Sequence, residues 1–253
     1  MEKTSMAHNL LLVSNSTLYG SGYLDHCESQ IRDVLEKRET VLFVPYARPS
    51  GMTWDEYTNL AHKRFEKMGF RLQGIQEWTD PKTAVESSEA IFIGGGNTFV
   101  LLKSLYDSEI MDQIKEKVNA GTPYIGTSAG SNVAGITIKT TNDMPIVYPP
   151  SFDAMGLVPF DINPHYIDPD LHSTHKGETR ETRIKEFHAA VDEGGKPINL
   201  YPVVGLREGA MLHVVGDKLH LKGSTAARIF RRKEEPREHQ PGESLDFLLS
   251  NTV

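Results

Sequence analysis

The chain carries the stretch Gly126-Thr127-Ser128-Ala129-Gly130 near its middle, after the apolar run 122–125 and before the helix-like run 131–134. A Gly-x-Ser-x-Gly sequence between a strand and a helix is typical of a nucleophile elbow, a tight turn that exposes the serine hydroxyl. The first amides of the following helix, with its positive dipole end, would face a developing negative charge. The pattern therefore predicts Ser128 as a nucleophile and the Ala129 N–H as a donor to an oxyanion.

Short apolar runs alternate with helical patterns through the first half of the chain. The strand-like runs are residues 10–13, 41–44, 91–93 and 124–125, and the helical patterns are residues 24–37, 53–68, 98–105 and 108–118. This alternation predicts an α/β fold, a single domain with a mostly parallel sheet flanked by helices. The active site of such a sheet lies beyond the carboxyl ends of its strands. The loops 14–17 and 94–96 fall at that edge, where Ser128 is also expected.

The second half of the chain is richer in loops. Residues 140–177 form short turns with many Asn, Asp, His and Pro residues, and a loop this long in a compact domain is usually functional. The pair Gly216-Asp217 between two apolar runs predicts a C-terminal β-hairpin. The expected parts are an N-terminal extension (1–8), one α/β domain (9–232) and a polar C-terminal tail (233–253), which is expected to be mobile in part.

The composition excludes several classes of protein. The net charge of −7 over 253 residues argues against nucleic acid as the main partner, because backbone recognition needs clustered Lys and Arg. The single cysteine, Cys27, allows no intramolecular disulfide and no cysteine-based metal cluster, and it falls on the apolar face of an expected helix. No apolar run approaches the ~20 residues that span a bilayer, and no signal-peptide stretch precedes Leu10. We therefore expect a cytoplasmic protein without membrane contact.

A serine nucleophile needs a base within hydrogen-bond reach and a third group that orients the base. His165 is the best candidate for the base, because Pro164 stiffens its approach and an apolar run precedes it. His172 and His175 have a spacing that could suggest a metal site, but no carboxylate or third histidine is placed to complete it. We expect those two histidines on the exposed surface, and no metal or organic cofactor.

Two acids could orient the base. Glu208 follows the strand-like run 203–206 and would reach the same sheet edge as Ser128, and Asp143 lies in a turn after the elbow helix. The loop Gly94-Gly95-Gly96 could donate amides to an oxyanion. As a phosphate cradle it lacks the third glycine of Gly-x-Gly-x-x-Gly, since Phe99 stands there, and it lacks the Gly-Lys-Ser/Thr of a P-loop, so nucleotide binding is disfavoured.

Seven segments, taken together and in order, resemble the peptidase E family of α-aspartyl dipeptidases. They are residues 12–17, 94–99, 126–130, 141–147, 162–165, 175–180 and 205–209. The likeness runs from about residue 9 to residue 230, so it is far more specific than the elbow alone. It implies a fold like that of the class I glutamine amidotransferases. It also implies a serine-type exopeptidase that cleaves dipeptides with an N-terminal aspartate through an acyl-enzyme intermediate.

The resemblance implies a role for each residue that matches a family motif. Ser128 would be the nucleophile, His165 the base, and Gly95 the first amide of the oxyanion hole beside the amide that follows Ser128. Both Asp143 and Glu208 match the family pattern for the third member of the triad. We favour Asp143 because its setting, Thr-Thr-Asn-Asp-Met-Pro, is the more elaborate of the two.

A substrate with an N-terminal aspartate presents a β-carboxylate and an ammonium group, so its pocket needs a cation and hydrogen-bond acceptors. Arg180 is the leading candidate for the cation, because a guanidinium can bind a carboxylate with two hydrogen bonds. Arg183 and Lys176 are alternatives, and their other interpretation is solvated surface charge. Asn97 or Thr98 would hold the substrate amine or shape the pocket. Such a pocket must act locally, since the net charge of −7 repels an acidic substrate.

Other readings of the same pattern stay open. One is a related hydrolase that cuts β-aspartyl or cyanophycin-type bonds, and another is a non-enzymatic binding or sensor protein on the same fold. A glutamine amidotransferase is disfavoured because Ser128 occupies the nucleophile position and Cys27 lies elsewhere. The sequence does not state the oligomeric state, and a homodimer remains open.

Overall fold

The structure is a computed structural model that describes residues 8–170, 172, 174 and 176–250. His175 and most of the predicted N-terminal extension lie outside the described residues. Of the predicted extension, the structure describes His8. This residue is buried against the domain, and its Nε2 lies 2.8 Å from Asn119 Oδ1.

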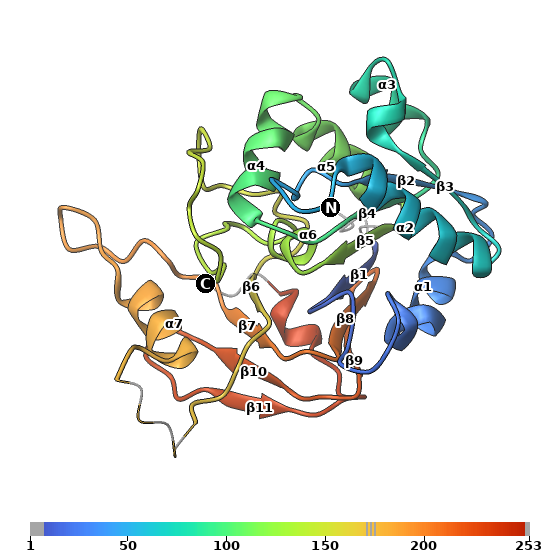
Figure 1. The fold of residues 1–253 in the computed structure, drawn as a ribbon. Helices are drawn as coiled ribbons and strands as arrows, with labels where there is room; N and C mark the ends of the chain where they lie inside the picture. The colour runs from blue at the N-terminus through green and yellow to red at the C-terminus, as the bar shows by residue number, and fades with distance from the viewer. Residues whose placement is uncertain (1–7, 171, 173, 175, 251–253) are drawn as a thin grey trace, which may run out of the picture.

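The main sheet has seven strands in the order β3-β2-β4-β5-β1-β8-β9 (Figure 1). Its strands are β1 (Asn9–Val13), β2 (Thr40–Val44), β3 (Arg71–Gly74), β4 (Ile91–Ile93), β5 (Tyr124–Thr127), β8 (Ala210–Val215) and β9 (Lys218–Gly223). The five strands from β3 to β1 are parallel, and β8 and β9 are antiparallel. The predicted C-terminal hairpin is confirmed, since Val215 pairs with Lys218 around Gly216.

Both faces of the main sheet are buried, which explains the continuous apolar runs of its strands. Successive side chains of a strand point to opposite faces. In β1, Leu10 and Leu12 accordingly join one core cluster, and Leu11 and Val13 join the other. Each such fully buried side chain contributes roughly 1.5–3 kcal/mol to stability. Cys27, predicted as a core residue, is also fully buried.

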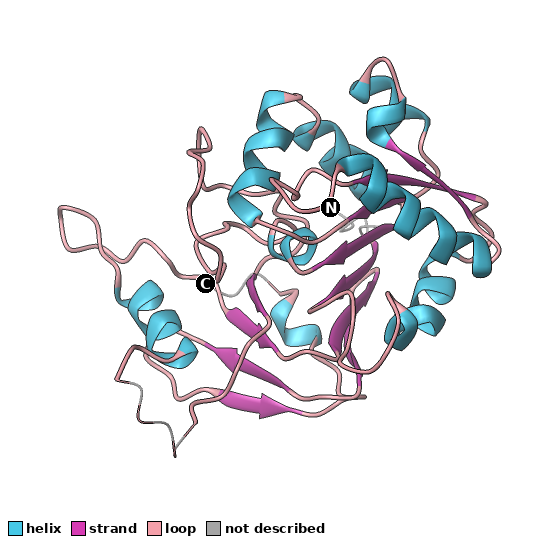
Figure 2. Ribbon diagram, viewed as in Figure 1, coloured by secondary structure: helices cyan, strands magenta, loops and turns pink. Residues whose placement is uncertain are grey.

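Helices cover the main sheet (Figure 2). The α-helices of this region are α1 (Glu28–Leu35), α2 (Trp54–Lys67), α3 (Pro81–Ser87), α4 (Thr98–Asp107), α5 (Met111–Asn119) and α6 (Ala129–Asn132), and the short 3-10 helices are η1 (Asp25–Cys27) and η2 (Ile75–Glu77). Buried side chains of α1 and α2 lie in one core cluster, and those of α4 and α5 lie in the other. The expected α/β architecture is therefore confirmed. Among the described residues, no helix has the length and apolar character that a membrane crossing requires.

A second sheet, which the sequence did not predict, lies beside the first. Its order is β11-β10-β7-β6, and its elements are β6 (Asp161–Pro164), β7 (Val203–Leu206), β10 (Ala227–Phe230), β11 (Arg237–His239) and the helix α7 (Arg180–Ala189) that packs on it. The strand β11 lies in the tail that we expected to be partly mobile. The 3-10 helix η3 (Asp246–Leu248) follows, with Leu245 and Leu248 buried in the main core. These apolar residues hold this part of the tail on the domain, and the partial mobility of the tail stays a prediction.

The second sheet places two loops at the active edge of the first. Its strands β6 and β7 run parallel with Pro164 opposite Leu206, so the residues after each strand emerge side by side. The Ser14 hydroxyl, just past β1, donates a 2.7 Å hydrogen bond to the Leu206 carbonyl. The two sheets therefore meet where the polar loops gather.

Candidate active site

Ser128 stands in the sharp turn between β5 and α6, as the sequence predicts. Its backbone has φ 53° and ψ −109°, a conformation that residues other than glycine rarely adopt and that costs of the order of 1–3 kcal/mol. Hydrogen bonds hold the turn in place: the Ser128 N–H donates to the Val13 carbonyl (3.0 Å), and the Ser131 hydroxyl donates to the carbonyls of Val13 (2.7 Å) and Gly126 (2.8 Å). The strained turn is thus built into the junction of two parallel strands.

The two flanking glycines are required by close packing. A Cβ on Gly126 would lie 2.5 Å from the Gly130 carbonyl oxygen, and a Cβ on Gly130 would lie 2.2 Å from the Ile93 carbonyl oxygen. Real Cβ atoms do not approach backbone oxygens so closely. The Gly-x-Ser-x-Gly pattern therefore has a steric cause on both sides of the serine.

Three side chains from separate loops form a linear arrangement. His165 Nε2 lies 3.0 Å from Ser128 Oγ, and His165 Nδ1 lies 2.7 Å from Glu208 Oε1. His165 follows β6 and Glu208 follows β7, so the pairing of these strands brings the base and the acid together. The side chains of His165 and Glu208 are 40% and 53% exposed, which leaves the site open to a ligand. This is the nucleophile–base–acid geometry of serine hydrolases.

The polar loop after β1 supports the base, which agrees with its predicted place at this edge. The Ser14 hydroxyl accepts a 2.9 Å hydrogen bond from the backbone N–H of His165. The Asn15 carboxamide oxygen accepts a 2.9 Å hydrogen bond from the backbone N–H of Gly209, next to Glu208. His165 itself has a positive φ of 52°, so these contacts fix an otherwise unfavourable backbone.

The geometry corrects our preference for Asp143 as the third member. Asp143 Oδ2 accepts hydrogen bonds from the backbone N–H (2.7 Å) and the hydroxyl (2.6 Å) of Thr98 and from the Thr141 hydroxyl (3.1 Å). A carboxylate at the N-terminal end of α4 is stabilised by the free amides and the dipole of that helix. Asp143 is thus a partner of α4, and Glu208 is the acid that contacts His165.

Asn97 and Thr98 also have structural partners. Asn97 caps α4 by accepting from the Val100 N–H, and its amide nitrogen donates to the Met144 carbonyl. Thr98 bonds to Asp143. These contacts tie the loop 141–145 to the start of α4. The structure therefore gives both residues a positioning role, and their predicted contact with a substrate amine stays a prediction.

Only one of the two predicted oxyanion donors is free. The Ala129 N–H opens α6 and has no backbone acceptor in the described part of the chain. Gly95 lies beside the nucleophile, since a Cβ there would stand 3.0 Å from Ser128 Cβ. However, its N–H donates a 2.9 Å hydrogen bond to Tyr57 Oη. The close approach of Gly95 is thus present, but its amide is engaged, which corrects the expectation of a free donor.

The predicted cations lie at the start of α7. Arg180 is the first residue of this helix, and with Arg183 it lines a small hollow formed by residues 139–142 and Asn163. Burial, followed by the charge of Arg183, lowers the pKa of Arg180, and the charge of Asp143 acts in the opposite direction. In the described residues neither arginine has an acidic partner within an ion-pair distance. The hollow therefore holds two uncompensated positive charges near Asp143, whereas Lys176 is exposed.

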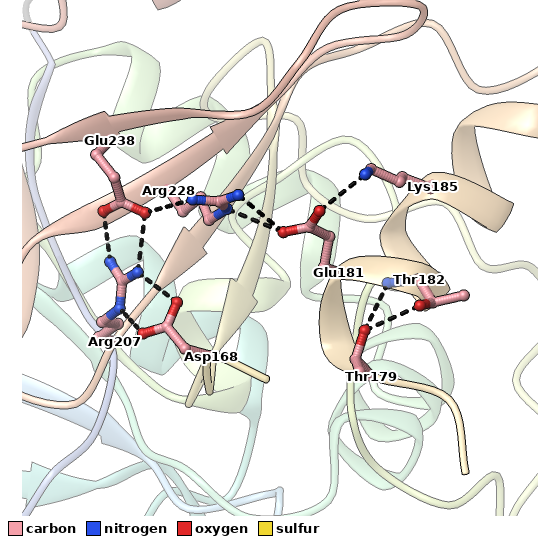
Figure 3. Close-up of polar contacts among 8 residues, drawn as sticks. All are labelled: Asp168, Thr179, Glu181, Thr182, Lys185, Arg207, Arg228 and Glu238. Carbon is pink, nitrogen blue, oxygen red and sulfur yellow. Dashed lines mark hydrogen bonds and ion pairs between the residues drawn. The ribbon is translucent and has the colours of Figure 1, made fainter. Parts of the chain in front are cut away.

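An ionic network, which the sequence did not reveal, connects these parts (Figure 3). The Arg207 guanidinium donates to both oxygens of Asp168 and to both oxygens of Glu238. The remaining links are Arg228 to Glu238 and Glu181, and Lys185 to Glu181. Arg207 directly precedes Glu208, and Glu181 directly follows Arg180. The network therefore ties the segments that carry the acid and the cation to the second sheet, through Arg228 of β10 and Glu238 of β11.

Within the described residues, no group of three or more His, Cys, Asp or Glu side chains is arranged to hold a metal ion. His172 is exposed, as expected. The contacts described above bring together a serine, a histidine, a carboxylate and a free amide at this edge. Such a set suits nucleophilic attack on a carbonyl carbon.

Known proteins with similar sequences carry the same names as the family that the motifs resemble. A probable alpha-aspartyl dipeptidase of Drosophila melanogaster is 47% identical, covering 96% of this chain and 98% of its own. A peptidase E of Streptomyces coelicolor is 46% identical, with 95% of each chain covered. In both cases the similarity extends over nearly the whole length of both chains.

Solved structures share the fold. A putative peptidase E protein from Listeria monocytogenes EGD-e superposes with a TM-score of 0.63 at 22% identity, covering 86% of this chain and 99% of its own. A peptidase from an acI-B1 Actinobacterium gives a TM-score of 0.69 at 18% identity, covering 95% and 97%. Residues 10–222 match Peptidase family S51, which covers every motif of the site. The chain therefore belongs to Peptidase family S51, a family of serine peptidases.

Proposed function

We propose that this chain is a dipeptidase that hydrolyses Asp-Xaa dipeptides through an acyl-enzyme intermediate on Ser128. The observation that carries the proposal is the continuous set of contacts from Ser128 Oγ through the His165 ring to Glu208. The names of the relatives support the substrate class, since one of them is called a probable alpha-aspartyl dipeptidase.

The geometry supports a two-step mechanism. His165 Nε2 takes the proton of Ser128 as Oγ attacks the carbonyl carbon of the aspartyl residue, and Glu208 stabilises the resulting imidazolium through Nδ1–H. The Ala129 N–H donates to the oxyanion of the tetrahedral intermediate. His165 then gives its proton to the leaving amine, which breaks the peptide bond. Water, activated by the same histidine, hydrolyses the acyl-enzyme and restores Ser128.

Positively and negatively charged side chains that lie near each other in the site would select a substrate with an N-terminal aspartyl residue. The guanidinium of Arg180, with that of Arg183, would bind the β-carboxylate, and the carboxylate of Asp143 would attract the free ammonium group. An asparaginyl substrate would leave the two cations without a charged partner in a partly buried site, which disfavours it strongly.

The proposal is tested with Ser128→Ala and His165→Ala, each expected to abolish hydrolysis of Asp-Leu while the protein stays folded. Ser29→Ala, on the exposed side of α1, is the matched control and should keep full activity. Near-normal activity of either active-site variant would overturn the mechanism.

Substrate comparison tests the specificity. Arg180→Met should lower kcat/KM for Asp-Leu by about 10- to 100-fold, the effect of losing a charge-assisted hydrogen bond, and Asn-Leu should be a poor substrate of the native protein. Faster hydrolysis of β-Asp-Leu than of α-Asp-Leu would instead assign a β-aspartyl hydrolase. Absence of labelling of Ser128 by a serine-directed acylating probe would favour a binding protein. A cytoplasmic location and a homodimer stay predictions of the sequence.

A further inference from the structure

Arg48 is connected to the nucleophile through its neighbours but has no role in the mechanism above. It follows β2, at the same sheet edge as Ser128, and its guanidinium carbon lies 4.6 Å from the centre of the Tyr57 ring. The Tyr57 hydroxyl accepts the hydrogen bond of the Gly95 N–H, and Gly95 packs against Ser128. Arg48 is thus linked to the nucleophile by three successive contacts, through Tyr57 and Gly95.

The charge of Arg48 has no acidic partner among the residues that the structure describes. Its side chain makes no ion pair and no hydrogen bond with any residue that the structure describes, and its Nε is buried without an acceptor. Other arginines that are partly covered, such as Arg64 and Arg207, pair with carboxylates. An unpaired buried donor of a charged group costs free energy, so this arrangement favours a ligand that supplies an acceptor.

Two further polar side chains, in the segment after β1, have atoms without hydrogen-bond partners among the described residues. The Tyr23 ring lies edge-on to the Tyr57 ring at 6.2 Å, and its buried hydroxyl has no hydrogen-bond partner in the described chain. Both ring nitrogens of His26 are likewise buried and unpaired. Tyr23 lies in the segment between Ser14 and η1, and His26 lies in η1, whereas the hydroxyl of Ser14 supports His165. Burial lowers the pKa of His26, and the nearby charge of Glu208 is among the effects that raise it, so His26 lies on the side of the site that holds the acid and the base.

In the proposed reaction, the leaving amine must lie on the side of the base, because His165 protonates it. The leaving residue of a dipeptide carries a free carboxylate close to that amine. We propose that Arg48, together with Tyr23 and His26, binds the C-terminal carboxylate of the leaving residue. The inference rests on the proposed function and specifies it further, since it makes a free C-terminus one carbon from the leaving nitrogen a requirement.

Two separate positive sites then recognise the two carboxylates of an Asp-Xaa dipeptide. Arg180 binds the β-carboxylate on the acyl side, and Arg48 binds the terminal carboxylate on the leaving side. In a longer peptide, a neutral amide replaces the terminal carboxylate that Arg48 would bind, so the peptide loses a charge-assisted hydrogen bond. The subsite thus accounts for a preference for dipeptides over longer peptides.

The test compares Asp-Leu with its C-terminal amide, Asp-Leu-NH₂, as substrates of the full-length protein. The native protein should hydrolyse the acid with a kcat/KM about 10- to 100-fold higher than the amide. Arg48→Met, which keeps the contact with the Tyr57 ring, should lower kcat/KM for the acid by a similar factor and leave the amide within about threefold. Arg48→Lys should recover part of the preference. Arg71→Met, at an exposed ion pair on β3, is the control and should change neither substrate.

The outcomes separate the two proposals. Equal hydrolysis of acid and amide by the native protein, or an equal loss on both substrates in Arg48→Met, would overturn the carboxylate subsite and leave the aspartyl dipeptidase intact. Hydrolysis of neither substrate by the native protein would overturn the proposed function, and the subsite with it. A selective loss on the acid alone supports both.

Discussion

Replacement of Arg207 by methionine should impair catalysis more than it impairs folding. The Arg207 side chain is 18% exposed and holds Asp168 with hydrogen bonds of 2.8 and 2.6 Å and Glu238 with two of 2.9 Å. It directly precedes Glu208, and Asp168 lies shortly after His165 in the chain. One guanidinium therefore braces the segments that carry both the acid and the base.

The cost in stability should be modest. Exposed ion pairs contribute about 0–1 kcal/mol each, and the carboxylates of Asp168 and Glu238 are 53% and 37% exposed. Arg207 makes two bidentate pairs in one network, which favours the upper end of this range for each pair. We therefore expect the free energy of unfolding to fall by about 1–2 kcal/mol, which lowers Tm by about 2–8 °C for a chain of this size. The effect of the substitution on kcat/KM should be larger than its effect on stability. A displacement of Glu208 or His165 by about 1 Å can lower kcat/KM by about 100-fold.

The assay measures kcat/KM for Asp-Leu and the melting temperature of the same preparations. Lys185→Met is the matched control, because Lys185 lies at the far end of the same network and, in the described part of the chain, bonds only to Glu181. It should leave kcat/KM within about twofold, whereas Arg207→Met should lower it by about 10- to 100-fold. Native kcat/KM in Arg207→Met, together with a lowered Tm, would refute the idea that the network positions the triad.

Two further predictions concern a buried acid and a glycine. Burial, partly offset by hydrogen bonds from two backbone amides, raises the pKa of Asp161 from its usual 3.8 to about 7. The folded state thus keeps this proton to a higher pH than the unfolded chain, and the associated stability, complete below about pH 4, is lost as the pH rises through 7. Asp161→Asn should remove this slope from urea unfolding between pH 4 and 8, and an unchanged slope would contradict the assignment. Gly95→Ala would place a methyl group 3.0 Å from Ser128 Cβ. It should lower kcat/KM about tenfold or more with little change in Tm, so full activity would argue against the close approach.

The elbow and the parallel sheet were predictable because short-range rules determine them. The positions that flank Ser128 require glycine because a Cβ there would clash with backbone oxygens. The apolar run of β1 reflects burial on both faces of one sheet. Each signal lies within a few residues of the feature that it predicts. The order of loops along the sheet edge then follows from the topology of parallel strands.

The choice between Asp143 and Glu208 was not predictable, because both acids follow plausible elements at the same edge. The contact of Glu208 with His165 depends on the pairing of β6 with β7 in a second sheet, and the sequence pattern predicted only one sheet. The engagement of the Gly95 amide by Tyr57 joins residues far apart in the chain. Neither contact leaves a local periodicity or a spacing that a reader of the sequence could detect.

The folded tail has a similar origin. Its composition is polar, yet Leu245 and Leu248 reach the main core, and Glu238 accepts hydrogen bonds from Arg207 and Arg228. Arg207 follows β7 and Arg228 lies in β10, so these partners are distant in the sequence and the tail gains order from the tertiary structure. Sparse apolar residues in a charged segment give too weak a pattern to predict such docking.

The comparison of Glu208→Gln with Asp143→Asn tests the central claim most directly. Glutamine keeps the size of Glu208 but cannot stabilise the imidazolium of His165, so kcat for Asp-Leu should fall by about 10²- to 10⁴-fold with little change in KM. Asparagine at 143 should act on binding, raising KM and leaving kcat within about tenfold. The opposite result, a native kcat in Glu208→Gln with a collapse of kcat in Asp143→Asn, would show that Asp143 is the acid of the triad and contradict the account.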